Sequence, residues 1–184
     1  ANILWVWGPG RPRELPSFES MYHLEASILS REPAARGLAR LAGLSIVEEG
    51  ADEGAPRDYE AAAHKAIEML ALRDIVIVHA DEAADYALEG NVCAKTDFVA
   101  SLDRGLIRPL WKHVQEAEFV RLLVLSTHTG SCARRRRLRA PAPALMCGPG
   151  LEPVREQPFS ERNIDGAEVP VRRGFELMEY FLRT

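Results

Sequence analysis

Several features are scarce in this sequence of 184 residues, and each scarcity excludes a class of protein. Cysteine occurs only three times, at Cys93, Cys132 and Cys147, and no two cysteines form a C-x-x-C pair. An odd number of widely spaced cysteines argues against a disulfide framework and favours a reducing compartment, so we expect a cytoplasmic protein. No apolar run approaches the roughly 20 residues that a membrane helix needs, and no secretory signal is visible. We therefore expect no membrane association.

An excess of basic residues is also lacking. The formal net charge is −4 and aromatic residues make up 7% of the chain, so nothing in the composition favours a nucleic-acid partner. Hydrophobic residues (47%) and charged residues (27%) are present in the proportions of an ordinary globular protein, and the length suits one domain with a sizeable core. The sequence begins at Ala1 and is strand-like almost at once. We interpret it as part of a longer protein. The remainder of that full-length protein is then expected to pack against this chain as a partner.

The most informative stretch is DIVIVHADEAAD, residues 74–85. Its run of β-branched residues at 75–78 is typical of a strand buried on both faces of a parallel sheet. Three acids follow the strand, at Asp81, Glu82 and Asp85. The carboxyl ends of the strands are where open α/β sheets place ligand and metal chemistry.

Short apolar strands alternate with helical patterns along the rest of the chain. Strands are predicted at 2–7, 24–29, 45–47, 74–79, 121–126 and 141–146, and helices at 17–22, 30–43, 58–72, 91–114 and 174–182. We expect Ser17 and Ser30 to cap their helices, and Pro109 to kink or split the long one. This alternation predicts an α/β fold with a mainly parallel sheet covered by helices on both faces.

Three loops leave the ends of apolar strands, at 8–17, 80–85 and 127–137. Strand ends of the same sense share one edge of a parallel sheet, so these loops are expected to converge. Together they offer acids, a histidine and several arginines.

Asp81 and Asp85 have two interpretations. Carboxylates four residues apart on a helical turn project from one face and suit hard or borderline cations. Acids in the first turn of a helix also simply favour the positive end of the helix dipole. His128, after a later strand, is either a metal ligand or base, or a hydrogen-bonded structural residue. His79 is expected to pack in the core, and Cys132 is a weak zinc signal without neighbouring ligands.

Four consecutive arginines form a concentrated positive segment: Arg134, Arg135, Arg136 and Arg137. Such a segment binds phosphate, binds nucleic acid or stands solvated at the surface. Nucleic acid is the least favoured of the three, because no aromatic residues alternate with the arginines.

The order of these motifs resembles the C-terminal part of the archaeal-type cofactor-independent phosphoglycerate mutases, in the alkaline phosphatase superfamily. The resemblance covers nearly the whole chain. It rests on LWVWGPG with LPSFESMYHLEASILS, VEEGADEGAPRDYEAAAHKAIEML, VIVHADEAAD, VLSTHTGSCARRRRLRAPAPALMCGPG and VRRGFELMEYFL. It implies that residues 1–184 form the C-terminal part of an alkaline-phosphatase-like core. The nucleophilic serine, a further aspartate ligand and the cap domain would then lie N-terminal to this chain.

In that family two divalent cations, often manganese or zinc, activate the serine that transfers the phosphoryl group of phosphoglycerate. The resemblance implies Asp81, Asp85 and His128 as metal ligands, and no catalytic residue within this chain. Of five ligands that the resemblance implies, only Asp81 and His128 are retained. One histidine position falls on Asp85, which is still able to ligate, an aspartate position falls on Thr127, and a later histidine position falls at or near Arg137.

These replacements lead to a hypothesis about the site. Arginines of the 134–137 segment would pair with Asp81 and Asp85 and substitute for at least one metal. The leading interpretation of the chain is part of a phosphoglycerate-mutase-like metalloenzyme of glycolysis. The alternative is a catalytically impaired relative, a pseudoenzyme that binds a phosphorylated small molecule or a protein partner through its arginines. The chain alone is expected to be inactive.

Overall fold

The computed structural model describes Gly10 and residues 14–49, 56–152, 158–166, 171 and 173–183 of the chain. The strand predicted at 2–7 lies outside these residues. The chain divides into two compact units, the first formed by residues 1–50 and 68–79 and the second by residues 51–67 and 80–184.

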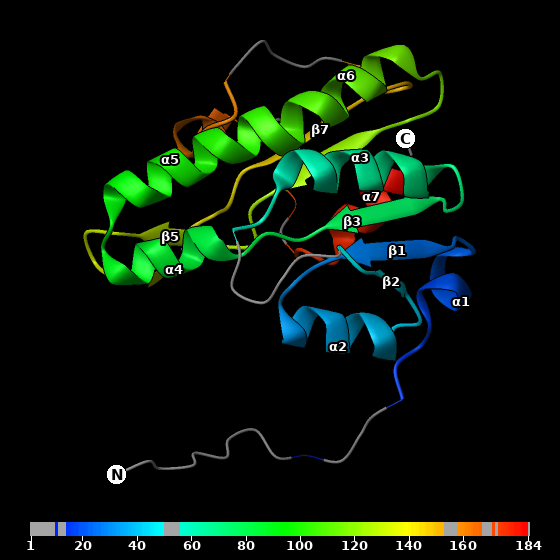
Figure 1. The fold of residues 1–184 in the computed structure, drawn as a ribbon, viewed down its shortest axis with the longest axis horizontal. Helices are drawn as coiled ribbons and strands as arrows, with labels where there is room; N and C mark the ends of the chain where they lie inside the picture. Colours follow the sequence, from blue (N-terminus) through cyan, green and yellow to red (C-terminus); the bar gives the residue numbers. More distant parts are fainter. Residues whose placement is uncertain are drawn as a thin grey trace. The chain divides into compact units, whose positions relative to one another are not determined.

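The first unit contains a small parallel sheet of three strands in the order β2-β1-β3 (Figure 1). The strands are β1 (Ala26–Leu29), β2 (Ser45–Val47) and β3 (Ile75–Val78). Every residue of the central strand β1 is buried, as expected for a strand with a parallel neighbour on each side. The predicted parallel sheet is thus confirmed for these three strands.

Two helices of the first unit show where local sequence signals hold and where they fail. Helix α1 (Phe18–Tyr22) is capped by Ser17, whose hydroxyl accepts from the Ser20 backbone N–H as predicted. Helix α2 (Pro33–Leu41) is capped by Glu32, so the predicted Ser30 cap is wrong. Ser30 is 1% exposed, and its hydroxyl bonds the Nδ1 atom of His79 at 3.1 Å. The same hydroxyl accepts from the Glu32 backbone N–H at 3.2 Å, so Ser30 bonds the cap residue of α2 and leaves the first-turn N–H of Ala35 to the Glu32 carboxylate.

The predicted helix at 58–72 is α3 (Tyr59–Leu70), which connects β2 with β3 and contributes residues to both units. Its buried positions are Tyr59, Ala62, Ala63 and Ala66. That spacing of three and four residues is the buried stripe of an amphipathic helix.

The second unit begins its helices with α4 (Glu82–Glu89) and α5 (Val92–Leu102). A π-helical turn, Asp103–Ile107, joins α5 to α6 (Arg108–Glu116), so the predicted long helix continues through a change of helix type just before Pro109 (Figure 1). Pro109 lies in the first turn of α6, where its missing N–H leaves few bonds unmade. A Cβ atom on Gly105 would lie only 3.2 Å from the Cβ of Tyr59, so the π turn packs closely on α3.

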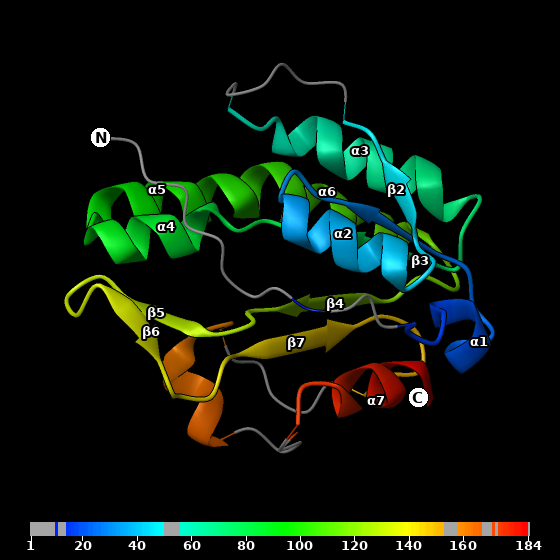
Figure 2. The ribbon, with the colours of Figure 1, turned by 90° about the horizontal axis from the view of Figure 1, so that it is seen from below.

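The strands of the second unit pair antiparallel, in contrast to those of the first (Figure 2). Strand β4 (Leu122–Leu125) pairs with β7 (Ala144–Cys147), close to two predicted strands. The segment predicted to be a loop is instead a hairpin of β5 (Thr129–Ser131) and β6 (Arg136–Leu138). A mainly parallel sheet is therefore only partly confirmed.

The last described elements are a 3-10 helix, Glu161–Gly166, and α7 (Glu176–Arg183), which matches the predicted closing helix. Within the described ranges, no helix combines the length and the apolar character needed to cross a membrane.

Candidate functional site

The acidic segment after β3 begins helix α4. Asp81 is half-buried at the N-cap position, and its carboxylate makes no capping hydrogen bond to the helix. Its backbone N–H donates to Glu82 Oε2 at 3.1 Å. Asp85, one turn further on, is exposed. Both acids lie at the start of a helix, as expected if they interact with the positive end of the helix dipole and also if they are metal ligands. Their position therefore does not decide between the two interpretations.

Glu82, the acid between them, has a structural partner. The hydroxyl of Tyr59 donates to Glu82 Oε1 at 2.6 Å, and Tyr59 itself is only 8% exposed. Burial, followed by the neighbouring Glu82 carboxylate, raises the pKa of Tyr59, so the phenol remains a proton donor at neutral pH. Phe98 packs edge-on against the Tyr59 ring with 5.8 Å between ring centroids. These contacts hold the first turn of α4 against α3 and α5. The sequence predicted only that Tyr59 lies in a helix, not that it bonds Glu82.

His128 lies at the start of the β5–β6 hairpin and is half-buried. Its Nδ1 atom and the Thr127 hydroxyl are 3.0 Å apart, and its carbonyl accepts from the Ser126 hydroxyl at 2.9 Å. Burial lowers the pKa of His128, and the positive charges of Arg137 and Lys95 lower it further. The surroundings of His128 are therefore electropositive.

Lys95, on α5, was not among the predicted site residues. Its ammonium group is half-buried and donates to the carbonyl of Gly130 at 2.8 Å. A Cβ atom on Gly130 would lie 3.1 Å from the Cβ of Ala87, so α4 packs directly on this face of the hairpin. A single lysine in an amphipathic helix gives no sequence signal of such a contact.

The four arginines of the segment are all exposed. Arg134 and Arg135 lie in the turn of the hairpin, and Arg136 and Arg137 lie in strand β6. Arg137 is opposite Gly130 in the strand register, and Arg136 is opposite Ser131. Arg135 has a positive φ of 46°, and its Nε lies 2.7 Å from where a Cβ on Gly90 would be. Gly90 itself has a φ of 77°, so a side chain is disfavoured there both by backbone conformation and by Arg135.

The structure does not assemble the predicted ligands into a metal site. Among the described residues, no group of three or more His, Cys, Asp or Glu side chains lies close enough to hold a metal ion. Asp81, Asp85 and His128 therefore do not form a three-ligand set, and the positive charges beside His128 oppose a further cation there. Within the same residues, no ion pair joins the arginine segment to Asp81 or Asp85.

The acidic loop and the hairpin are linked through helix α4, and the contacts lie beyond the predicted loop 80–85. Helix α4, which follows the acidic loop, contacts both strands of the β5–β6 hairpin. The contact is made by the second half of α4, through Ala87 and Gly90, whereas Asp81 lies at its beginning. The third predicted loop, 8–17, belongs to the first unit, and only residues 10 and 14–17 of it are described.

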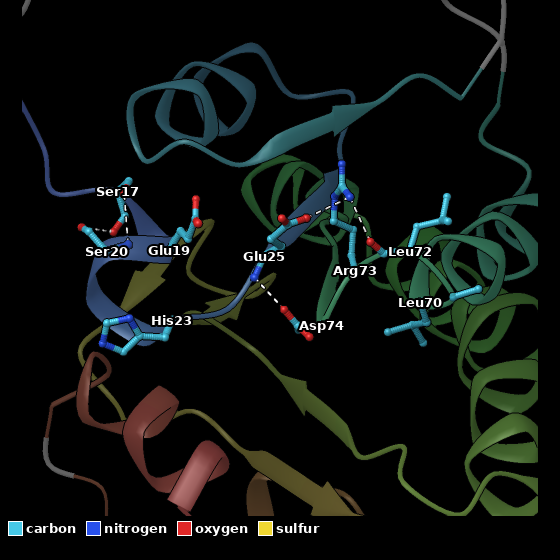
Figure 3. A pocket seen from close by; sticks show the side chains of 10 residues that line it. Ser17, Glu19, Ser20, His23, Glu25, Leu70, Leu72, Arg73 and Asp74 are labelled. Atoms are coloured by element: carbon cyan, nitrogen blue, oxygen red, sulfur yellow. Dashed lines mark hydrogen bonds and ion pairs between the residues drawn. The ribbon is translucent and has the colours of Figure 1, made fainter.

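The first unit has a cavity of about 800 Å³ at the amino ends of β1 and β3 (Figure 3). It is lined by Ser17, Glu19, Ser20, His23, Glu25, Leu70, Ala71, Leu72, Arg73 and Asp74. Arg73 Nη1 lies 3.0 Å from Glu25 Oε2, and Asp74 Oδ2 accepts from the Glu25 backbone N–H at 2.7 Å. None of these side chains is a predicted site residue, because the predicted ligands follow strands whereas Glu25 and Asp74 precede β1 and β3.

No family model matches the chain. A curated 2,3-bisphosphoglycerate-independent phosphoglycerate mutase from Methanosarcina acetivorans is 28% identical over 187 residues, an alignment that covers 100% of this chain and 47% of the relative. The chain is a partial homologue of the archaeal-type 2,3-bisphosphoglycerate-independent phosphoglycerate mutases. The resemblance stated from the sequence is thereby confirmed. The chain spans about half the length of the mutases that it matches.

Solved structures share the fold. The PH0037 protein of Pyrococcus horikoshii matches with a TM-score of 0.64 and 22% identity, over 72% of this chain and 35% of that protein. A cofactor-independent phosphoglycerate mutase from Thermoplasma acidophilum matches with a TM-score of 0.51 and 18% identity, over 75% of this chain and 30% of that one. At these identities the likeness concerns the fold alone, an α/β arrangement with a small parallel sheet.

Proposed function

We propose that this chain is the C-terminal portion of a phosphoglycerate-mutase-like protein, and that it binds a phosphorylated small molecule at its cationic hairpin. The cationic hairpin is defined as residues 129–138. The homology supports the class of ligand, because the matched relatives are phosphoglycerate mutases. The observation that carries the proposal is the charge of the hairpin. Among the described residues, no carboxylate lies within 4 Å of the guanidinium groups of residues 134–137.

The chemistry of such a site follows from its donors. Guanidinium groups present paired N–H donors that match phosphate oxygens, and the ammonium of Lys95 adds a compact point charge at the same place. An anion there would be stabilised by charges that otherwise repel one another. Binding of this kind positions a phosphate monoester and requires no reacting group within the described residues.

The proposal extends to the fold. The small parallel sheet of the first unit would belong to an alkaline-phosphatase-like core whose sheet is larger, mainly parallel and covered by helices on both faces. Residues 1–184 would then be one part of that core, completed by the remainder of the full-length protein. The partial coverage of the mutase relatives supports this extension.

A second candidate function is the metal-dependent phosphoryl transfer that the family resemblance implies. Asp81 favours it, since its half-buried carboxylate follows β3 and makes no cap bond to α4. In this alternative, Asp81, Asp85 and His128 would be metal ligands, and the serine would come from outside the chain. The described residues contain no group of three such ligands, so further donors would have to complete any such site.

Calorimetric titration and a turnover assay separate the two candidates. We expect the 184-residue chain to bind 3-phosphoglycerate without converting it, and we expect added manganese to leave both results unchanged. Manganese-dependent conversion by this chain would support the metalloenzyme and overturn our proposal. A chain that shows no binding of 3-phosphoglycerate at low salt would overturn it as well.

A further inference from the structure

The two faces of the cationic hairpin differ, and the difference assigns separate roles to its arginines. Directly opposed residues of an antiparallel pair project from the same face of the sheet, and neighbours along a strand project from opposite faces. Arg137 therefore shares a face with Gly130, whereas Arg136 shares the other face with Ser131. The face of Gly130 is the one against which Ala87 of α4 packs. We call it the inner face.

Three basic side chains gather on the inner face or at its border. The Lys95 ammonium donates to the Gly130 carbonyl and lies 3.7 Å from the position of a Cβ on Gly130. Arg137 stands opposite that same glycine. His128, two residues before Gly130, is close enough to both cations for their charges to act on it. Gly130 carries no side chain, which lets Ala87 and the Lys95 ammonium approach the strand closely.

The described residues supply no counterion for the group. No carboxylate lies within 4 Å of Lys95 or Arg137, although Lys95 is half-buried and keeps two ammonium protons beyond the one that Gly130 accepts. Holding two like charges together beside a partly buried imidazole is unfavourable without an anion between them. Charge arrangements that weaken the fold in this way are typical of ligand sites.

We propose that Lys95 and Arg137, with His128 beside them, form the subsite for the dianionic phosphate group of a phosphate monoester. This inference rests on the proposed function and narrows it from a whole arginine segment to one face of the hairpin. It adds Lys95, a residue from a different element, as an anchor of the ligand. It gives Arg134 and Arg136 only a long-range electrostatic contribution.

Arg135 has a different role from its neighbours. Its guanidinium stem lies against Gly90, the residue that ends α4, and its backbone N–H donates to the Cys132 carbonyl at 3.3 Å. Gly90 closes the C-terminal end of the helix, where a positive side chain is favoured by the helix dipole. Arg135 therefore attaches the hairpin turn to α4 and is not assigned to the subsite.

Titration calorimetry on single variants of the whole chain tests the assignment, with inorganic phosphate and 3-phosphoglycerate as separate ligands. Arg137→Ala and Arg136→Ala are a matched pair, because each removes one positive charge from the same strand. We expect Arg137→Ala to weaken binding of both ligands by about tenfold or more, and Arg136→Ala by no more than about threefold. Lys95→Ala should weaken binding as Arg137→Ala does. Thermal unfolding of each variant verifies that it is folded.

The outcomes distinguish this inference from the function on which it rests. If the unmodified chain binds neither ligand, the proposed function fails and the subsite fails with it. If the chain binds but Arg136→Ala and Arg137→Ala lose affinity equally, only the subsite is overturned, and binding is due to diffuse charge. Because no described hydrogen bond or ion pair involves the side chain of Arg137, its result remains decisive even if Lys95→Ala does not fold.

Discussion

Three arginines of the first unit pair with glutamates of that unit, whereas the hairpin of the second unit gathers positive charges that no described carboxylate meets. At the cavity of the first unit, Arg73 pairs with Glu25, and Asp74 accepts a backbone N–H. At the hairpin of the second unit, Lys95 bonds a carbonyl and Arg137 has no ion-pair partner among the described residues.

We interpret the paired charges of the first unit as stabilising the fold, and the unpaired positive charges of the hairpin as a binding site for an anion. A carboxylate and a guanidinium that pair with each other add a little stability to the fold. Because their charges cancel, the pair attracts an external ion only weakly. Like charges held together without a counterion reduce stability, and a bound anion would relieve that cost. We therefore assign ligand binding to the hairpin, even though the first unit has a cavity of its own.

Removing the Tyr59 hydroxyl would introduce an unmet negative charge into the second unit. In Tyr59→Phe, the half-buried carboxylate of Glu82 loses the donor that lies 2.6 Å from Oε1. We expect the free energy of unfolding to fall by about 1–2 kcal/mol, the range for a hydrogen bond to a partly buried charge. Urea denaturation measures the change. Tyr22→Phe is the matched control, since no described hydrogen bond involves its hydroxyl, and an equal loss in both variants would refute the role of the Tyr59–Glu82 bond.

Removing Arg73 tests whether the charges of the first unit serve the fold alone. Arg73 and Glu25 form a pair with side-chain exposures of 31% and 59%, so Arg73→Ala should lower the free energy of unfolding by less than about 1 kcal/mol. We expect its affinity for inorganic phosphate to match that of the unmodified chain. A loss of affinity comparable to that of Arg137→Ala would show that the two units do not differ as described.

The smallest effect is expected from the cap of α2, and it should depend on pH. The backbone N–H groups of Ala35 and Ala34 hold the pKa of Glu32 below its ordinary value of 4.5. The ionised carboxylate therefore stabilises the folded state above that value, and this contribution disappears as the pH falls through the lower folded-state pKa. Glu32→Gln should be less stable than the unmodified chain at pH 7, and the difference should shrink in acid. Glu118→Gln, at an exposed position without a described partner, is the control. A difference that stays constant from neutral to acidic pH would contradict the assignment.

The sequence by itself determined most of the elements. Periodicity and turn residues located β1, β2, β3, β4 and α3, together with the closing helix, because these signals depend on neighbours within a few residues. The Ser17 cap is local in the same sense and was confirmed. The family resemblance also came from the linear order of motifs, and the homology confirms it.

The tertiary structure decided which residues meet. Ser30 is not the cap residue of α2: its hydroxyl bonds His79, 49 positions away, and the Glu32 backbone N–H, while Glu32 takes the cap position. The hairpin depends on pairing between residues 129–131 and 136–138, which a run of arginines does not signal, and Lys95 reaches it only because α5 packs nearby. Asp81, Asp85 and His128 were chosen for their chemistry, yet a ligand set requires a shared location that residue type does not specify. Local patterns fix elements, whereas sites are made by long-range contacts, and these depend on the packing of the whole unit.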